Sequence, residues 1–429
     1  MLAFSRRLRL VMVPFFLNSL CSIAFAENHM VVMGGGGDSG SKTIFDSTYK
    51  TLMTSSAFSQ WRKISVFDGG HSDTEKMIAK YAKGSNKSAT TAGMNSTIAD
   101  LQMAIRSGSI KKGDQLFLNI VTHGLSPTGK NLTHTVVTTN GEFNVDEMKK
   151  LRDLAESKGV KLAIFDASCH SGYTLALATN KTCVVTGTGE GVGYNTTGSD
   201  FAEKIKPGAS IEDVFLNMRN LSPDVLAAPQ ISSPAGRKAY ETTKSLSHAM
   251  MDLDTLKSPN TDTKKTFGAQ CSDFKKLQDE LQRLTHASVN SNELSGLKKA
   301  IETYNNKRKS VQSKIDAASS LGPRKCIDYN NDWQLCGTFD ALEASYQDLK
   351  GSSKKLNERD QLKHKALDHF VKSAEFKKWK TATANLTKLP SLEVEAEKVA
   401  IEEKKLYSLL YKQYSKEAKG ANPCKDFVF

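Results

Sequence analysis

Two segments of the sequence place a residue that can do chemistry directly after an apolar run. Residues 161–172 read Lys-Leu-Ala-Ile-Phe-Asp-Ala-Ser-Cys-His-Ser-Gly, so that Cys169 and small, turn-forming residues follow a strand-like segment. Residues 116–124 read Leu-Phe-Leu-Asn-Ile-Val-Thr-His-Gly and bring His123 to the same position. The thiolate is the nucleophile in cysteine chemistry, and a nearby histidine that accepts the proton activates the thiol. The pattern therefore predicts a nucleophilic cysteine with a histidine base.

Such a pair works only if both residues lie together, which depends on the elements that carry them. Helix-length segments separate five apolar, β-branched runs that predict buried strands, at residues 30–33, 64–67, 115–121, 161–165 and 183–186. This alternation is typical of βαβ units and predicts an α/β fold with a mostly parallel sheet flanked by helices. The carboxyl ends of parallel strands meet at one edge, where ligands bind. We therefore expect Cys169 and His123 at that edge, on neighbouring strands.

The motifs around this pair resemble those of a known clan of peptidases. Cys169-His170-Ser171-Gly172 resembles the cysteine motif of metacaspases, and His123-Gly124 resembles the His-Gly of the caspase clan. Pro229-Gln230 is similar to a Pro-Gln found late in metacaspase domains. The separation of 46 residues between His123 and Cys169 resembles the caspase spacing. The resemblance covers residues 28–250 and belongs to a clan that also includes the legumain, clostripain and gingipain families.

The resemblance implies a caspase-like fold and a cysteine endopeptidase that hydrolyses peptide bonds through a thioester intermediate. Cys169 would attack the peptide carbonyl, and the backbone N–H groups of Gly124 and Cys169 would bind the oxyanion. His123 would then protonate the leaving amine. His170 is not expected to be the base, because adjacent residues on an extended chain point to opposite sides. We expect His170 to line the substrate groove.

One position departs from the pattern of the resembled families. Members commonly carry a specificity residue two positions before the cysteine, which is acidic in metacaspases and legumains, and here that position is Ala167. Asp166 is the nearest acid, and it would reach a pocket if a bulge re-aimed it. Asp38 and Glu190, in glycine-rich loops after two strands, are the other candidates for the substrate pocket. An acidic pocket would favour Lys or Arg before the scissile bond.

Other residue patterns do not indicate a cofactor or a nucleic-acid partner. Residues 35–43 nearly spell a phosphate loop, but Lys42 comes one residue too late for that spacing. The histidines and acids show no metal-ligand spacing, so no metal and no cofactor is expected. The formal charge of +13 is spread along the chain without a compact nucleic-acid motif. We therefore expect protein or peptide partners and no nucleic acid.

The N-terminus reads as an export signal. Three arginines precede an apolar run that ends in Ala24-Phe25-Ala26, which is typical of a signal peptide with a small-residue cleavage site. We assign residues 1–26 to this segment and expect the mature chain to be periplasmic or secreted, without a stable membrane span. A retained anchor is the less favoured alternative, because Pro14, Asn18 and Ser19 interrupt the apolar run.

Composition changes near residue 250, which predicts a second domain. We expect a caspase-like peptidase domain over residues 27–252, a polar linker over 253–268 and an all-α domain over 269–429. Apolar residues recur at three and four positions in the third segment, as in amphipathic helices: Phe274, Leu277, Leu281, Leu284, Leu406, Leu409, Leu410 and Tyr414.

Four cysteines in this second part predict disulfides in an oxidising compartment. Three pairings of Cys271, Cys326, Cys336 and Cys424 are possible. We favour Cys326 with Cys336, which are ten residues apart, and Cys271 with Cys424, which would join the first and last segments of the domain. This choice leaves Cys169 and Cys183 unpaired, and we expect Cys183 to pack as a small hydrophobic residue.

The sequence therefore predicts an exported cysteine endopeptidase. The main alternative is an inactive caspase-like binding or scaffold protein that acts through its helical domain, and peptide ligation by the same chemistry is a third possibility. Only Tyr173–Thr182 separate the cysteine motif from the next strand, so we expect the sheet to function uncut. The helical domain would either cover the site until self-cleavage at Lys257, Lys264 or Lys265, or dock substrates.

Overall fold

The structure of the chain is a computed structural model. Besides a few single positions between 279 and 306, it describes residues 27–35, 39–68, 71–127, 133–190, 197–221, 228–243, 325–330, 333–387 and 391–429. The expected signal peptide, the expected linker, Cys271 and Asp38 lie outside the described residues.

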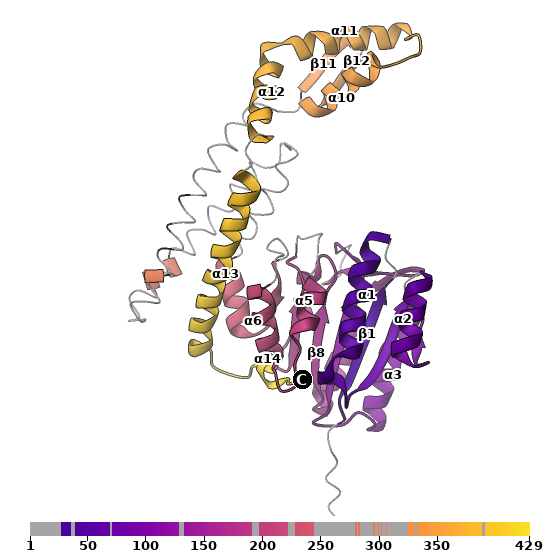
Figure 1. The fold of residues 1–429 in the computed structure, drawn as a ribbon, viewed down its shortest axis with the longest axis vertical. Coiled ribbons are helices and arrows are strands. Elements are labelled where there is room, and N and C mark those ends of the chain that lie inside the picture. Colours follow the sequence, from indigo (N-terminus) through magenta and orange to yellow (C-terminus); the bar gives the residue numbers. More distant parts are fainter. Residues whose placement is uncertain are drawn as a thin grey trace, which may run out of the picture.

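Seven strands form one sheet, in the order β10–β9–β8–β4–β1–β2–β3 (Figure 1). Five of them contain the runs predicted from the sequence: β1 (His29–Gly35), β2 (Arg62–Asp68), β4 (Gln115–Val121), β8 (Lys161–Asp166) and β9 (Thr182–Thr186). These five strands pair in parallel. The short strand β3 (Asn86–Lys87) is also parallel, whereas β10 (Gln230–Ile231) is antiparallel to β9. The predicted mostly parallel sheet is confirmed.

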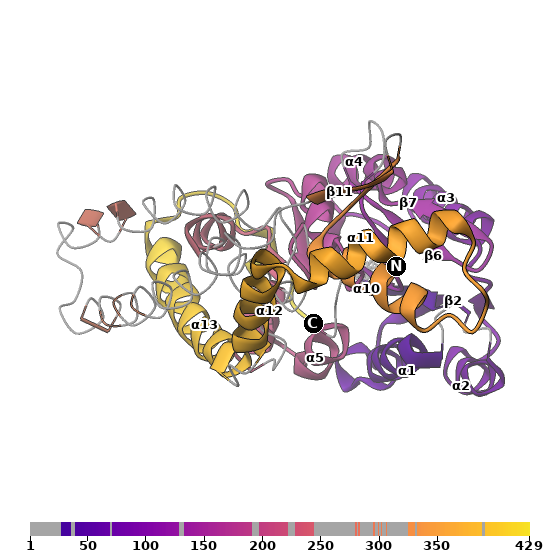
Figure 2. The same cartoon turned by 90° about the horizontal axis from the view of Figure 1, so that it is seen from above.

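Helices cover both faces of this sheet because alternate residues of its strands are buried on opposite sides. In β1, Met30 and Val32 belong to one hydrophobic core, and Val31 and Met33 belong to the other. The first core is covered by α1 (Ser39–Thr54), α2 (Ser72–Ala82), α5 (Thr197–Lys204) and α6 (Ile211–Leu221). The second is covered by α3 (Thr91–Ser107) and α4 (Met148–Lys158). Figure 2 shows α1, α2 and α5 on one side of the molecule and α3 and α4 on the other.

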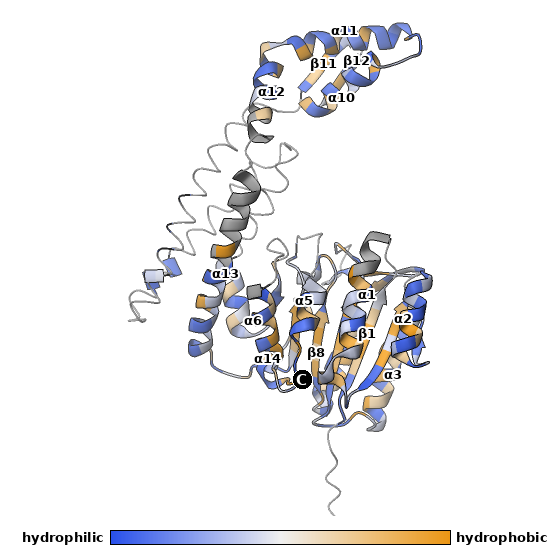
Figure 3. Cartoon of the chain, viewed as in Figure 1, coloured by the Kyte–Doolittle hydropathy of each residue, from blue (hydrophilic) through white to orange (hydrophobic). Residues whose placement is uncertain are grey.

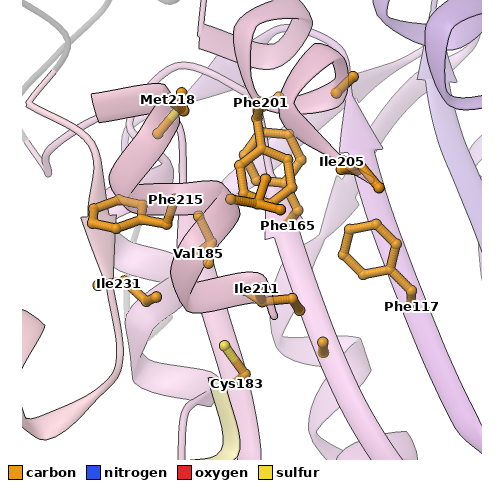
Figure 4. Packing of buried hydrophobic residues seen from close by; sticks show 14 of the residues in the cluster. Phe117, Phe165, Cys183, Val185, Phe201, Ile205, Ile211, Phe215, Met218 and Ile231 are labelled. Carbon is orange, nitrogen blue, oxygen red and sulfur yellow. The ribbon is translucent and has the colours of Figure 1, made fainter. Parts of the chain in front are cut away.

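Aromatic side chains fill the first core. The rings of Phe165, on β8, and Phe201, on α5, stack with their centroids 4.0 Å apart (Figure 4). Phe215 and Met218 reach the same core from α6 (Figure 4). In Figure 3 hydrophobic residues concentrate in the strands, and hydrophilic residues lie on the outer faces of the helices. This packing holds the strands, and with them the edge of the sheet, in place.

A small antiparallel sheet follows β4 and supports its end. It consists of β5 (Gly124–Leu125), β6 (Thr135–Thr138) and β7 (Gly141–Asn144). The hydroxyl of Thr122 shares its one proton between the carbonyl oxygens of Gly35 (2.8 Å) and Val137 (2.9 Å). The N–H of Val137 donates in turn to the carbonyl of His123 (2.9 Å). The backbone on both sides of His123 is therefore fixed. Short 3₁₀ turns, η1 (Ser56–Phe58), η2 (Val145–Glu147) and η3 (Ser171–Leu177), complete this domain.

The C-terminal part is not all helical, which corrects the sequence expectation. A hairpin of β11 (Lys325–Asn330) and β12 (Trp333–Gly337) precedes α10 (Phe339–Lys350), α11 (Glu358–Lys372) and α12 (Ala374–Thr387). These elements share a small core of their own around Phe339, Phe370, Phe376 and Trp379. We call residues 325–387 the distal arm; in Figure 1 it lies apart from the sheet. No helix that the structure describes combines the length and the apolar character needed to cross a membrane.

The last residues of the chain belong to the α/β domain. Helix α13 (Ser391–Glu417) leads back to it, and α14 (Pro423–Asp426) precedes the C-terminus. Tyr407, Leu410, Tyr411, Tyr414, Phe427 and Phe429 are buried in the first core. The rings of Phe429 and Phe117, on β4, lie 5.1 Å apart. The predicted division into residues 27–252 and 269–429 is therefore wrong, because the arm interrupts one domain.

The disulfides confirm one predicted pair and correct the other. Cys326 pairs with Cys336 across the hairpin, as expected from their spacing. Cys424 pairs with Cys183 of β9, so the predicted Cys271–Cys424 bond is wrong, and Cys183 is not an unpaired hydrophobic residue. The tail that carries Cys424 packs at the amino end of the sheet, which brings it to β9. Among the described cysteines, Cys169 is the one that forms no disulfide.

Candidate active site

The ends of β4 and β8 lie side by side at the carboxyl edge of the sheet. Ile120 pairs with Asp166 in the register of the two strands, and the N–H of Ala167 donates to the carbonyl of Ile120 (2.9 Å). His123 follows Ile120 by three residues, and Cys169 follows Asp166 by three residues. The two candidate catalytic residues therefore leave neighbouring strands at the same edge and at equal distances along the chain.

The Cys169 thiol is half-buried, and backbone N–H groups face its sulfur. Burial raises the pKa of the Cys169 thiol, because the thiolate loses hydration, and the negative charge of Asp166 raises it as well. Hydrogen bonds from the backbone N–H of Gly124 and of Cys169 itself act in the opposite direction, and the pKa remains above its ordinary value. These are the two donors that the sequence assigned to the oxyanion hole.

Gly124 lets the histidine segment approach the cysteine turn. A Cβ atom on Gly124 would lie 2.0 Å from the carbonyl oxygen of Cys169 and 2.9 Å from the hydroxyl of Ser168. No side chain fits at this position, so glycine is what allows the Gly124 N–H to reach the sulfur. Gly172 has a similar role, since its Cβ would lie 2.4 Å from the backbone nitrogen of Glu190.

The His123 ring is half-buried and packs against α1. It lies edge-on to the ring of Phe45, with centroids 5.1 Å apart, and Phe45 is buried. This contact limits the rotation of the imidazole, while the backbone of His123 is held through Val137. An imidazole restrained in this way has one preferred orientation, which is what a general base needs.

The turn after Cys169 is stabilised from the loop that follows β9. Ser171 donates its N–H to the hydroxyl of Thr188 (3.0 Å), and Thr188 donates its N–H to the hydroxyl of Ser171 (3.0 Å). His170 has a φ of +58°, in the left-handed region. Its Nδ1 donates to the carbonyl of Glu190 (3.2 Å), and its Nε2 lies 3.5 Å from the hydroxyl of Ser126. His170 therefore bridges two loops at the rim of the site.

No protein-family model and no curated protein matches the chain. What the site can do is therefore inferred from its own residues.

Asp166 does not have the surroundings of a pocket residue. Its side chain is fully buried, and Oδ2 accepts hydrogen bonds from His134 Nε2 (2.8 Å) and the hydroxyl of Thr174 (2.6 Å). Oδ1 accepts the N–H (3.0 Å) and the hydroxyl (2.6 Å) of Ser168. Burial by itself would raise the pKa of Asp166, but the His134 imidazole and these hydrogen bonds hold it below its ordinary value. The expectation that Asp166 contacts substrate is corrected: its oxygens are engaged inside the protein.

Of the other two candidates for substrate binding, the structure describes Glu190 and not Asp38. Asp38 lies outside the described residues. Glu190 is exposed and follows β9 at the same edge as Cys169, so its carboxylate is open to a ligand. Within the described part of the chain, no three side chains of His, Cys, Asp or Glu cluster in a way that could hold a metal ion.

Sequence reasoning missed the polar residues that support the cysteine turn. They are His134, Ser168, Thr174 and Thr188, and all four are buried. His134 precedes β6, and Thr174 lies in η3, so only tertiary contacts bring them to Asp166. Single polar residues in such segments have no periodicity or spacing that would reveal this role.

Proposed function

We propose that the chain is an exported cysteine endopeptidase of the caspase-like class, with Cys169 as nucleophile and His123 as base. One observation carries the proposal: Gly124, the residue after His123, packs directly against the backbone of Cys169 and brings its N–H to the thiol. His123 is presented at the same edge, from the neighbouring strand. A thiol that is in no disulfide, with backbone donors beside it and a restrained imidazole, matches what acyl transfer by a cysteine requires.

The geometry supports the following sequence of steps. His123 accepts the thiol proton, and the Cys169 sulfur forms a bond to the peptide carbonyl carbon. The negative charge moves to the carbonyl oxygen, which the N–H groups of Gly124 and Cys169 stabilise. The C–N bond then breaks, and His123 gives its proton to the leaving amine. Water activated by His123 hydrolyses the thioester, which releases the acid product and restores the thiol.

A preference for Lys or Arg before the scissile bond rests on fewer acids than the sequence suggested. Glu190 is the described acid that remains available, and Asp166 is not. A guanidinium or ammonium group that leaves water needs a carboxylate partner, and an exposed Glu190 at the site edge offers one. The loop of Glu190 is anchored to the cysteine motif through His170.

Export is supported by two features besides the N-terminal motif. Two disulfides join described cysteines, and such bonds persist in oxidising compartments. Glu27, the residue after the expected cleavage site, donates its N–H to the buried carboxylate of Asp114 (2.9 Å). A free amino group at this position would keep that hydrogen bond and add charge to it.

The experiment that tests the peptidase function is labelling with a peptidyl thiol-reactive probe that carries Arg, combined with a fluorogenic peptide assay. We expect Cys169→Ala to abolish both signals. His123→Ala should lower kcat/KM by roughly 1,000-fold or more, because members of a catalytic unit fail together. His170→Ala is the matched control, since it removes a neighbouring imidazole that is not the base. Full cleavage by the Cys169→Ala protein, or an equal loss in the His170→Ala protein, would contradict the assignment.

A binding or scaffold role through the distal arm is the alternative. The observation in its favour is that the arm has a core of its own and lies apart from the sheet. The same probe separates the two functions, because a scaffold protein would leave Cys169 unlabelled by peptidyl probes while the folded arm still binds a partner.

A further inference from the structure

A buried acid–imidazole pair lies next to the cysteine turn and takes no part in the proposed proton transfers. Asp166 Oδ2 and His134 Nε2 are 2.8 Å apart, and both side chains are fully buried. Removing a carboxylate from water costs roughly several kcal/mol, and apolar residues of similar volume often stabilise a fold as well as a buried polar pair does. Stability alone therefore does not account for this pair.

The Asp166 carboxylate contacts the chain on both sides of the nucleophile. Oδ1 accepts two hydrogen bonds from Ser168, the residue before Cys169. Oδ2 accepts one from Thr174, in the 3₁₀ turn that follows Cys169. The His134 imidazole lies 3.0 Å from the same Thr174 hydroxyl, so it holds both the acid and the turn. One carboxylate thus joins the two ends of the segment that carries the thiol.

The direction of this segment matters for the chemistry. The Cys169 N–H is one of the two oxyanion donors, and its direction depends on the turn formed by residues 168–170. The positive φ of His170 shows that the turn is a conformation that the chain does not adopt by default. A displacement of about 1 Å at a reacting group can cost on the order of 100-fold in rate.

We propose that Asp166, held by His134, is a positioning residue that fixes the turn and thereby aims the Cys169 thiol and N–H at the substrate carbonyl. This inference rests on the proposed peptidase function. In this role Asp166, the acid nearest to Cys169 in the sequence, lies inside the protein and supports the nucleophile. It does not contact the side chain of the substrate.

The same carboxylate acts on the thiol through its charge. After burial and the Gly124 hydrogen bond, the negative charge of Asp166 is the next influence on the thiol, and it raises the pKa of Cys169. The other titratable groups around the turn are His134, His123, and His170 with Glu190 at the rim. Removing the charge of Asp166 while keeping its shape should therefore lower the pKa of Cys169.

Two substitutions of Asp166 separate its two effects in a kinetic assay. Asp166→Ala removes the acceptor of the Ser168 bonds, and we expect kcat to fall by about 100-fold with little change in KM. Asp166→Asn keeps an oxygen that can accept these bonds, so it should recover much of that loss. Tyr411→Phe is the matched control, because it breaks a buried polar contact with Ser233 (2.9 Å) in the same domain, away from the cysteine turn.

Alkylation of Cys169 by iodoacetamide, followed by mass spectrometry over a pH series, gives a readout that needs no peptidase activity. We expect the apparent thiol pKa to be lower in Asp166→Asn than in the wild type and unchanged in Tyr411→Phe. Equal alkylation profiles in all three proteins, or a loss of kcat in Asp166→Ala no larger than in Tyr411→Phe, would overturn the proposal. If the wild type cleaves no peptide, the peptidase function fails, but the alkylation series still decides whether Asp166 acts on Cys169.

Discussion

At the scale of single residues, Gly124 determines how closely the segments of His123 and Cys169, the two candidate catalytic residues, approach each other. Its N–H lowers the pKa of the Cys169 thiol, against the larger effect of burial, which raises it. During attack the same N–H would donate a hydrogen bond to the oxyanion. One donor would thus stabilise the thiolate in the ground state and the oxyanion in the transition state. A catalytic donor is effective when it is in place before the charge develops, and the absence of a side chain at Gly124 makes this possible.

We predict that Gly124→Ala lowers kcat/KM by about 100-fold or more, in line with the loss of one oxyanion donor. The added Cβ would lie 2.0 Å from the Cys169 carbonyl oxygen, which forces the segment and its N–H away from the sulfur. Gly337→Ala is the control, because its Cβ would meet side chains at ordinary distances of 3.4 Å or more in the distal arm. Peptide kinetics and thermal unfolding are measured together. Wild-type kinetics in a folded Gly124→Ala protein would show that this N–H does not bind the oxyanion.

At the scale of elements, the C-terminal tail belongs to the α/β domain, although it is the last segment of the sequence. The N–H of Ile211 donates to the carbonyl of Phe427 (3.1 Å), and the N–H of Gly208 donates to the carbonyl of Phe429 (2.7 Å). Phe427 and Phe429 pack on Trp61, with ring centroids 6.1 and 6.4 Å apart. The Cys183–Cys424 bond ties this tail to β9, so the amino end of the sheet is closed by residues from the far end of the chain.

We predict that the paired change Cys183→Ala and Cys424→Ala lowers the free energy of unfolding of the α/β domain by about 2–5 kcal/mol. The bond spans 241 residues, so its removal frees a long loop in the unfolded chain. Cys326→Ala with Cys336→Ala should leave this domain unchanged, since that bond spans ten residues within the arm. Urea unfolding is followed by the fluorescence of Trp61, in a background where Trp333 and Trp379 are changed to Phe. An equal loss of unfolding free energy in the two double variants would contradict the separate roles of the two disulfides.

At the scale of the whole molecule, the distal arm is an insertion between two parts of one domain. Residues 228–243 belong to the α/β domain, and α13 belongs to it again, where Tyr411 and Tyr414 contact Ser233 and Thr242. Cleavage at Lys257, Lys264 or Lys265 would therefore not release the arm, because α13 and the disulfide retain the C-terminal fragment. In Figure 1 and Figure 2 the arm lies beyond the carboxyl ends of the strands.

We predict that a chain ending at Leu256 does not fold. It lacks the buried rings of Tyr407, Tyr411, Tyr414, Phe427 and Phe429. The loss of one such ring costs about 3–5 kcal/mol, and whole domains are stable by only about 5–15 kcal/mol. Replacing residues 325–387 with a short Gly-Ser linker should preserve folding and probe labelling of Cys169. Circular dichroism and labelling compare the two proteins, and a folded, labelled chain ending at Leu256 would refute the insertion.

The protein in which a linker replaces residues 325–387 also distinguishes a docking arm from a cover. A docking arm predicts unchanged cleavage of small peptides and weaker cleavage of whole proteins after excision. Faster cleavage of small peptides would instead indicate a cover.

The sequence by itself determined the strands, their parallel arrangement and the common edge of His123 and Cys169, because each depends on local apolar patterns and on the residue that follows a strand. It also identified Cys326–Cys336, since ten residues suffice to close a hairpin. Only the tertiary structure decided that Asp166 turns inward to His134, that Cys183 pairs with Cys424, and that the tail completes the core. The disulfide joins residues 241 positions apart, and the tail packs on residues still further away in the sequence. Packing selects such partners with no trace in local composition.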